Sequence, residues 1–335
     1  MKTNKSFFLL LLLLICSQVL VSQDSKIYFS VLGRRVSTVV GQDIVINGLY
    51  ASNKDMNSFS HIGSNNFMPF NIAIDKKSNG KNIFLACANG VMRSTDFGSN
   101  WKILTSWEIT EVQKVYLDPN NSNIIYLTSS FGVWKSTDFG ETWIKKCDGL
   151  KLVSQTYNTC LAILPSNTNI LYLGTANGIA ISKNGGDSWE TLDLSGREIY
   201  DIQIAPYDEK YMACGTEDAG VYVTTDGGKI WRQMNYGLKG NSIYTIAFDP
   251  ARKGTIYCGG HLSGLNKSTD FGEKWIPYDN EINDKIIRAI VINPNKADEI
   301  YVGSLNYGLY KSSDGGKSFK CAAECDGRIW SITIQ

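Results

Sequence analysis

The chain has 335 residues, of which 43% are hydrophobic and 19% charged, so it can bury a large core and is not disordered in composition. Lysine and arginine total 33 against 32 aspartates and glutamates, a formal net charge of +1. This balance gives no electrostatic reason to expect nucleic acid or an anionic membrane as a partner.

The first 22 residues have the pattern of a secretory signal peptide. Two lysines give a positive start, residues 7–15 are an unbroken apolar run, and Ser22 is a small residue suited to cleavage. The run is too short to span a bilayer as a stable helix. We therefore expect an exported protein, periplasmic or extracellular, whose residues 23–335 form one domain without a membrane span.

An eight-residue pattern, called the box below, recurs along the rest of the chain. It opens with Ser or Thr, has Asp or Asn third and Gly fifth, and closes on Trp or Phe. Six copies match this pattern, and the first copy is degenerate, since it keeps the opening Ser and the closing Phe but lacks the Asp and Gly. The seven copies cover 52–59, 94–101, 136–143, 182–189, 224–231, 268–275 and 312–319. Their starts lie 42–46 residues apart, a period typical of a solenoid, propeller or array.

The segments between the boxes distinguish these architectures. Before each box stand two β-rich segments separated by a turn that contains Gly, as in 125–136, and a further alternating strand lies upstream, as in 200–206. A fourth strand is expected to begin at the closing aromatic residue of the box. Four strands in each repeat of this length predict an all-β fold, a seven-bladed β-propeller of four-stranded blades.

The two ends of the chain predict how the ring closes. Residues 327–335 match the first strand of a blade, and no further strand follows them. The segment up to Phe59 holds the later strands of a blade but no first strand. We expect the C-terminal strand to join the N-terminal blade, which removes exposed sheet edges. Residues 26–32 are either an extra strand or a strand of this mixed blade.

The acidic or amide residue of each box is expected to serve the turn. Its side chain can accept hydrogen bonds from nearby backbone N–H groups, and the Gly two residues later tolerates positive φ. A metal or catalytic site would need residues that converge on one point, whereas the boxes are evenly spaced around a ring. We therefore assign a structural role to Asp96, Asp138, Asn184, Asp226, Asp270 and Asp314, and expect no metal site among them.

These boxes resemble the BNR or Asp-box repeats of sialidases, the sortilin ectodomain, xyloglucanases and photosystem II assembly factors. In size and layout the chain is most similar to the assembly-factor-like family, which has a signal segment and a lone seven-bladed propeller. That resemblance implies an exported, non-catalytic scaffold, assembly factor or structural subunit that binds other proteins, including subunits of a larger complex. The basic patch of the family is not evident here.

The enzymatic alternative is a glycoside hydrolase or carbohydrate-binding protein of the Asp-box type. Residues 172–178 and 308–316 resemble xyloglucanase strands, but those enzymes resemble two propellers that face each other, and hydrolysis needs two carboxylates about 5–10 Å apart. The sialidase arginine triad is not matched. His61 and His261 fall in expected loops away from any motif Ser or Cys. We expect no catalytic residue and no cofactor, and the chain is more similar to a binding protein than to an enzyme.

One position in the first strands is a candidate binding surface. Alignment of these strands places seven residues at it: Phe70, Gln113, Thr159, Tyr200, Tyr244, Arg288 and Trp330. If this position reached the rim of the central channel, four aromatic rings and one Arg would form a recognition surface. The alternative is that the aromatics pack between blades, since the same strand face continues with isoleucines.

The connections between blades carry a second set of candidates. They vary most along the chain, and function usually lies on loops held by a rigid scaffold. We expect the aromatic residues in them to be exposed and to contact a partner: Trp107, Tyr157, Tyr236 and Tyr278. Among the cysteines, Cys87 and Cys214 are expected in the core, and pairing of Cys321 with Cys325 stays open.

Overall fold

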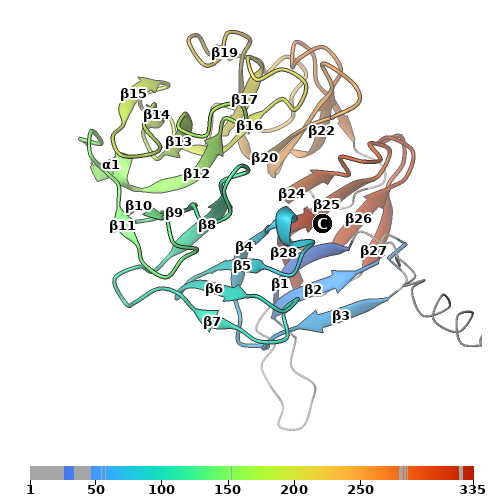
Figure 1. Ribbon diagram of the computed structural model, residues 1–335. Helices are drawn as coiled ribbons and strands as arrows, with labels where there is room; N and C mark the ends of the chain where they lie inside the picture. The colour runs from blue at the N-terminus through green and yellow to red at the C-terminus, as the bar shows by residue number, and fades with distance from the viewer. Residues whose placement is uncertain are drawn as a thin grey trace, which may run out of the picture.

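The computed structural model describes residues 26–33, 47–53, 55–56, 58–151, 153–278, 282, 284, 286–323 and 327–335. It shows seven four-stranded antiparallel sheets arranged as a ring (Figure 1), which confirms the predicted seven-bladed propeller. The expected signal peptide, residues 1–22, lies outside the described residues, as does Cys325. Within the described ranges, no helix is long and apolar enough to cross a membrane.

Each blade is a meander whose first strand lines the central channel and whose fourth lies at the rim. Blade 1 contains β28 (Gly327–Ile334), β1 (Ile27–Gly33), β2 (Gly48–Ser52) and β3 (Phe59–Ile62). The remaining strands follow in chain order: blade 2, β4 (Pro69–Ile74), β5 (Ile83–Cys87), β6 (Gly90–Ser94), β7 (Lys102–Ile103); blade 3, β8 (Val112–Leu117), β9 (Ile125–Ser129), β10 (Gly132–Ser136), β11 (Ile144–Lys145); blade 4, β12 (Asn158–Ile163), β13 (Leu171–Thr175), β14 (Gly178–Ser182), β15 (Glu190–Asp193).

The last three blades complete the ring: blade 5, β16 (Ile199–Ile204), β17 (Met212–Thr216), β18 (Val221–Thr224), β19 (Arg232–Gln233); blade 6, β20 (Ser242–Phe248), β21 (Ile256–His261), β22 (Gly264–Ser268), β23 (Ile276–Tyr278); blade 7, β24 (Ile287–Ile292), β25 (Ile300–Ser304), β26 (Leu309–Ser312), β27 (Lys320–Ala323). A 3-10 helix, η1 (Lys76–Ser78), and one turn of helix, α1 (Val153–Thr156), are the described helical segments. His61 therefore lies in β3 and His261 ends β21, so their expected placement in loops was wrong.

Burial falls from the middle of each blade to its rim. The second strands β5, β9, β13, β17 and β25 are buried at every residue, because both of their faces pack against neighbouring blades. This explains their continuous apolar runs, which a strand exposed on one face would not have. The two-residue outer strands β7, β11 and β19 are exposed throughout. The core is thus a series of interfaces between blades.

The C-terminal strand closes the ring as predicted. β28 pairs antiparallel with β1 from Ile27↔Ile334 to Gly33↔Gly327, and β1 pairs in turn with β2. Figure 1 shows the red C-terminal strand beside the blue N-terminal one. The open question about residues 26–32 is resolved, since β1 is the second strand of this mixed blade. The two ends of the chain are therefore joined by a seven-pair ladder.

Each clear box forms the hairpin between the third and fourth strands of its blade. In blade 6 the Ser268 hydroxyl donates to Asp270 Oδ1 (2.7 Å) and accepts from Gly272 N (2.8 Å), while Asp270 Oδ1 also accepts from Lys274 N (2.9 Å). The carboxylate is therefore held by donors from its own turn. In blade 3, hydrogen bonds from Thr142 and Ser136 lower the pKa of Asp138 to about 2.

The boxes also connect neighbouring blades. The indole N–H of Trp143 donates to Leu104 O (3.1 Å) and that of Trp275 donates to Met234 O (2.7 Å), each in the preceding blade. From the other direction, the buried Tyr257 of β21 donates to Gly315 O (3.0 Å) in the box of blade 7. Such bonds satisfy polar groups that the apolar interfaces would otherwise leave unpaired, so each box helps to set the spacing between blades.

Candidate binding site at the channel mouth

The meander assigns each connection to one of two faces. Because the strands are antiparallel, the boxes and the turns between first and second strands share one face, called the box face. The connections between blades and the turns between second and third strands share the other, called the loop face. First strands begin at the loop face, so the aligned position at their start lies close to it.

A β-bulge occurs at this aligned position in every blade. The pairing of β16 passes from Ile199↔Thr216 to Asp201↔Gly215 and skips Tyr200, and the pairing of β24 skips Arg288 in the same way. The other ladders skip Phe70, Gln113, Thr159, Tyr244 and Trp330. A bulge leaves one residue unpaired and re-aims side chains, so the aligned residue and the one after it both reach the channel in most blades.

These seven residues, called the mouth ring, line a cavity of about 490 Å³ in the central channel. The rings of Tyr200 and Tyr244 meet edge to face with centroids 5.0 Å apart. Arg288 lies 4.4 Å from the Tyr244 ring and 4.3 Å from the Trp330 ring, and Trp330 lies 5.5 Å from Phe70. The structure therefore brings five mouth-ring residues, from blades 5, 6, 7, 1 and 2, into one contiguous row, and the volume is in the range of small-ligand sites.

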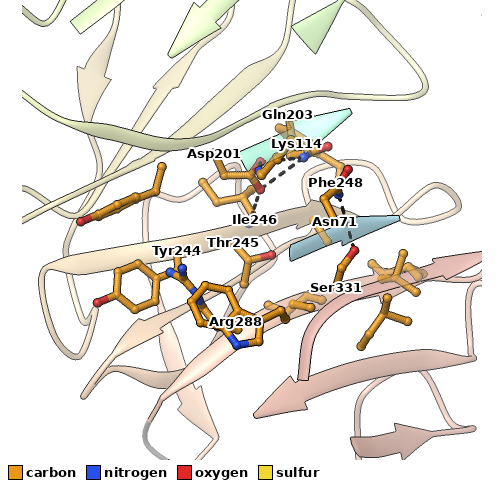
Figure 2. Close-up of a pocket in the computed structure, with 18 of the residues that line it drawn as sticks. Asn71, Lys114, Asp201, Gln203, Tyr244, Thr245, Ile246, Phe248, Arg288 and Ser331 are labelled. Atoms are coloured by element: carbon orange, nitrogen blue, oxygen red, sulfur yellow. Dashed lines mark hydrogen bonds and ion pairs between the residues drawn. The ribbon is translucent and has the colours of Figure 1, made fainter. Parts of the chain in front are cut away.

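A polar layer lies one residue deeper in the channel. Lys114 Nζ lies 3.1 Å from Asp201 Oδ1, which joins blades 3 and 5 across the ring. Gln203 donates to the same carboxylate (3.1 Å), and Asp201 Oδ2 accepts from Ile246 N (3.0 Å) in blade 6 (Figure 2). Burial alone would lower the pKa of Lys114, but the Asp201 carboxylate raises it well above its usual range. This pair was missed from the sequence.

Similar bonds join other first strands. Ser331 Oγ accepts from Ile72 N (3.3 Å), and Asn71 Oδ1 accepts from Val115 N (3.1 Å). The Tyr116 hydroxyl accepts from Leu161 N (2.9 Å). Each bond connects a side chain of one first strand to the backbone of the next. The polar groups of this layer are therefore largely used in closing the ring.

Two carboxyl groups flank the mouth ring at blade 5. Glu198 precedes β16, Glu217 follows β17, and their carboxyl groups hydrogen-bond each other. Burial and the charges of Glu198 and Glu217 raise the pKa of Tyr200. Burial, the bond to Glu217 and its charge raise the pKa of Glu198 from 4.5 to about 7. Nothing in the sequence signals this pair, because the two residues come from different connections on the loop face.

The Glu198 pKa predicts a pH dependence of stability. Between pH 4.5 and about 7, folded Glu198 keeps a proton that the unfolded chain releases, so the free energy of unfolding falls as pH rises through this window. Glu198→Gln keeps a neutral group there. We expect it to raise the melting temperature by about 2–4 °C at pH 8 and to leave it unchanged at pH 5. Exposed Glu190→Gln is the control, and an equal effect at both pH values would contradict the assignment.

The aromatic candidates in the connections are not all exposed. Trp107 is 84% exposed, Tyr236 is 74% and Tyr157 is 38%, and Tyr157 lines the cavity beside the mouth ring. Tyr278 instead lies in β23, where its ring packs edge to face on Phe319 and its hydroxyl donates to Gly316 O. Its expected exposure was wrong, because the closing Phe of the next box covers it.

Exposed apolar side chains gather on the loop face. The described residues of this kind in its connections and turns are Met68, Trp107, Phe131, Val153, Tyr157, Tyr236, Leu262 and Tyr307. On the box face, the described boxes expose Phe59, Phe97 and Ile230. Surface apolar residues scattered singly need no explanation, whereas their concentration on one face is typical of an interaction surface.

The described residues contain no group of three or more His, Cys, Asp or Glu side chains placed to hold a metal ion. Cys87 and Cys214 are buried, as expected for core residues. Burial raises the pKa of the Cys87 thiol to about 12 and that of Cys214 well above its usual range, which disfavours the reactive thiolate.

No protein-family model and no curated protein matches this chain. Among solved structures, YCF48 bound to a D1 peptide aligns with TM-score 0.60 and 16% identity over 76% of this chain and 82% of that one. The extracellular domain of BT4673 from B. thetaiotaomicron aligns with TM-score 0.65 and 15% identity over 87% of this chain and 38% of that one.

An ancestral GH74 enzyme aligns with TM-score 0.56 and 24% identity over 63% of this chain, and a GH74 xyloglucanase from Xanthomonas campestris with TM-score 0.56 and 12% identity over 84%. This chain spans 31% and 57% of the lengths of those two proteins. At such identities the likeness is one of fold. The chain is a β-propeller whose neighbours include both binding proteins and enzymes.

Proposed function

We propose that this protein is an exported, non-catalytic propeller that binds another protein through its loop face. The observation that carries the proposal is the concentration of exposed apolar side chains on the loop face. Trp107 and Tyr236 lie in different connections, so a partner that contacts both would span the face. A rigid ring loses little conformational entropy on docking, and the peptide bound by the similarly folded YCF48 is consistent with a protein partner.

The carbohydrate alternative is less well supported by the geometry. Glu198 and Glu217 are the carboxyl pair beside the mouth ring, but they hydrogen-bond each other. Glycoside hydrolysis needs carboxylates about 5–10 Å apart, with the sugar between them. Asp201, deeper in the channel, is ion-paired with Lys114. Turnover of xyloglucan or another polysaccharide by the purified protein would contradict the non-catalytic proposal.

The proposal predicts that partner capture depends on the loop face. Purified protein serves as bait for the exported fraction of its native host, and captured proteins are identified by mass spectrometry. Trp107→Ser with Tyr236→Ser should reduce capture of a specific partner at least tenfold, since hot-spot aromatics contribute about 2 kcal/mol or more each. The control is Ile230→Ser with Ile144→Ser, exposed apolar residues of a box and an outer strand. Equal loss in both variants, or in neither, would count against the proposal.

A further inference from the structure

Arg288 is held in the mouth ring by two aromatic rings from neighbouring blades. Its guanidinium lies 4.4 Å from the Tyr244 ring of blade 6 and 4.3 Å from the Trp330 ring of blade 1. Figure 2 shows Arg288 beside Tyr244 at the same level of the channel. Stacking of this kind fixes the plane of the guanidinium. The five N–H donors lie in that plane, so the rings leave them free to bind a ligand.

The structure provides no acceptor for those donors. Across the described ranges, no hydrogen bond or ion pair of Arg288 is present. Two other arginines are paired: Arg93 contacts Phe139 O and Glu141, and Arg252 contacts Asp249 and Asp298.

The surroundings of Arg288 make this lack of a partner costly. Burial lowers the pKa of Arg288, although Tyr244, Tyr200 and Tyr157 oppose the effect. The Glu198–Glu217 pair lies beside Tyr200 and does not bond to the guanidinium. A partly desolvated cation with unused donors gains most from an anion that supplies acceptors in its plane.

We propose that Arg288 binds a carboxylate group of the polypeptide segment that enters the channel mouth. This inference rests on the proposed function, because it names the chemistry of the partner at that site. A carboxylate is planar and offers two oxygens that match the guanidinium fork. Phosphate fits less well, because it carries about two charges, and the other cation that lines the cavity, Lys114, is already paired with Asp201. The carboxylate can come from one of two sources in a polypeptide, the C-terminus of the chain or an acidic side chain.

Small probes test this site directly in the purified protein. N-acetyl-phenylalanine carries a terminal carboxylate, N-acetyl-aspartate methylamide carries a side-chain carboxylate, and N-acetyl-phenylalaninamide carries none. Titrations followed by ligand-observed NMR should show at least tenfold tighter binding of one carboxylate probe than of the amide. The tighter carboxylate identifies the source, and either result supports the proposal. Tighter binding of methyl glucuronide than of both amino-acid probes would assign the site to an acidic polysaccharide and overturn it.

Variants separate a binding role from a packing role. Arg288→Gln should remove the preference for carboxylate over amide, Arg288→Lys should retain part of it, and exposed Arg232→Gln in β19 should leave it unchanged. Thermal melts confirm that each variant is folded, and the lysine variant preserves the test if the glutamine variant is not. Equal affinity for acid and amide, or an unchanged preference in Arg288→Gln, would overturn the carboxylate site. If the carboxylate site is overturned in this way while Trp107 and Tyr236 are still needed for partner capture, the proposal of protein binding at the loop face stands without a carboxylate site.

Discussion

Removal of residues 327–335 is expected to abolish the folded ring. β28 is the innermost strand of blade 1 and packs against β24 on one side and β4 on the other. Its Ile329, Ile332 and Ile334 are at most 8% exposed. Burial of such side chains contributes about 1.5–3 kcal/mol each, together about 5–9 kcal/mol, against a typical total stability of about 5–15 kcal/mol. Thermal and urea denaturation of the truncated chain measure the effect.

The same experiment contains its own control. A synthetic peptide of residues 327–335, added to the truncated chain, should restore a cooperative transition, because the lost strand contacts the rest through a non-covalent ladder. Without the peptide, β1 presents an unpaired edge and the protein should aggregate. A truncated chain that stayed soluble and melted at the temperature of the intact protein would contradict closure by β28.

The second large effect is expected at the Lys114–Asp201 pair. Asp201→Asn retains an acceptor for Ile246 N but removes the charge opposite Lys114. Breaking a buried pair on one side costs about 3–5 kcal/mol. Because the Lys114 side chain is 27% exposed, we expect about 2–3 kcal/mol here, read from the midpoint of urea denaturation.

A double-mutant cycle shows whether the loss comes from an uncompensated charge. Lys114→Met combined with Asp201→Asn should be more stable than Asp201→Asn alone, since no unpaired lysine remains. Glu190→Gln, which breaks an exposed pair with Lys183, should change the midpoint little. If the double variant were less stable by the sum of the two single effects, the two side chains would not be coupled.

The number of blades could be predicted from the sequence because the same hydrogen-bonded hairpin, the box, recurs from blade to blade. A Ser or Thr that bonds to an Asp two residues later, as Ser268 does to Asp270, occurs within one turn and needs no distant residue. Strand order follows from the meander, and closure follows from an unmatched strand at each end. The mouth ring could also be predicted from the sequence, because alignment of the first strands places Tyr200, Tyr244 and Arg288 at one equivalent position.

The features that escaped prediction depend on register and on contacts across the ring. The β-bulge that skips Tyr200 depends on how β16 pairs with β17. Lys114 and Asp201 are 87 residues apart and bypass blade 4 entirely. The Glu198–Glu217 pair arises from two connections that only the folded blade brings together. Tyr278 was expected to be exposed because its neighbour across the blade interface, Phe319, belongs to a different repeat.

Amide hydrogen exchange with and without the captured partner tests most directly whether the loop face is the binding surface. We expect slower exchange in the connections at 104–111 and 234–241 and at the first residues of β16, β20 and β24, all of which lie on the loop face. The hairpins at 94–101 and 224–231 on the box face should exchange at unchanged rates. Protection of those hairpins, with the loop face unaffected, would contradict binding at the loop face.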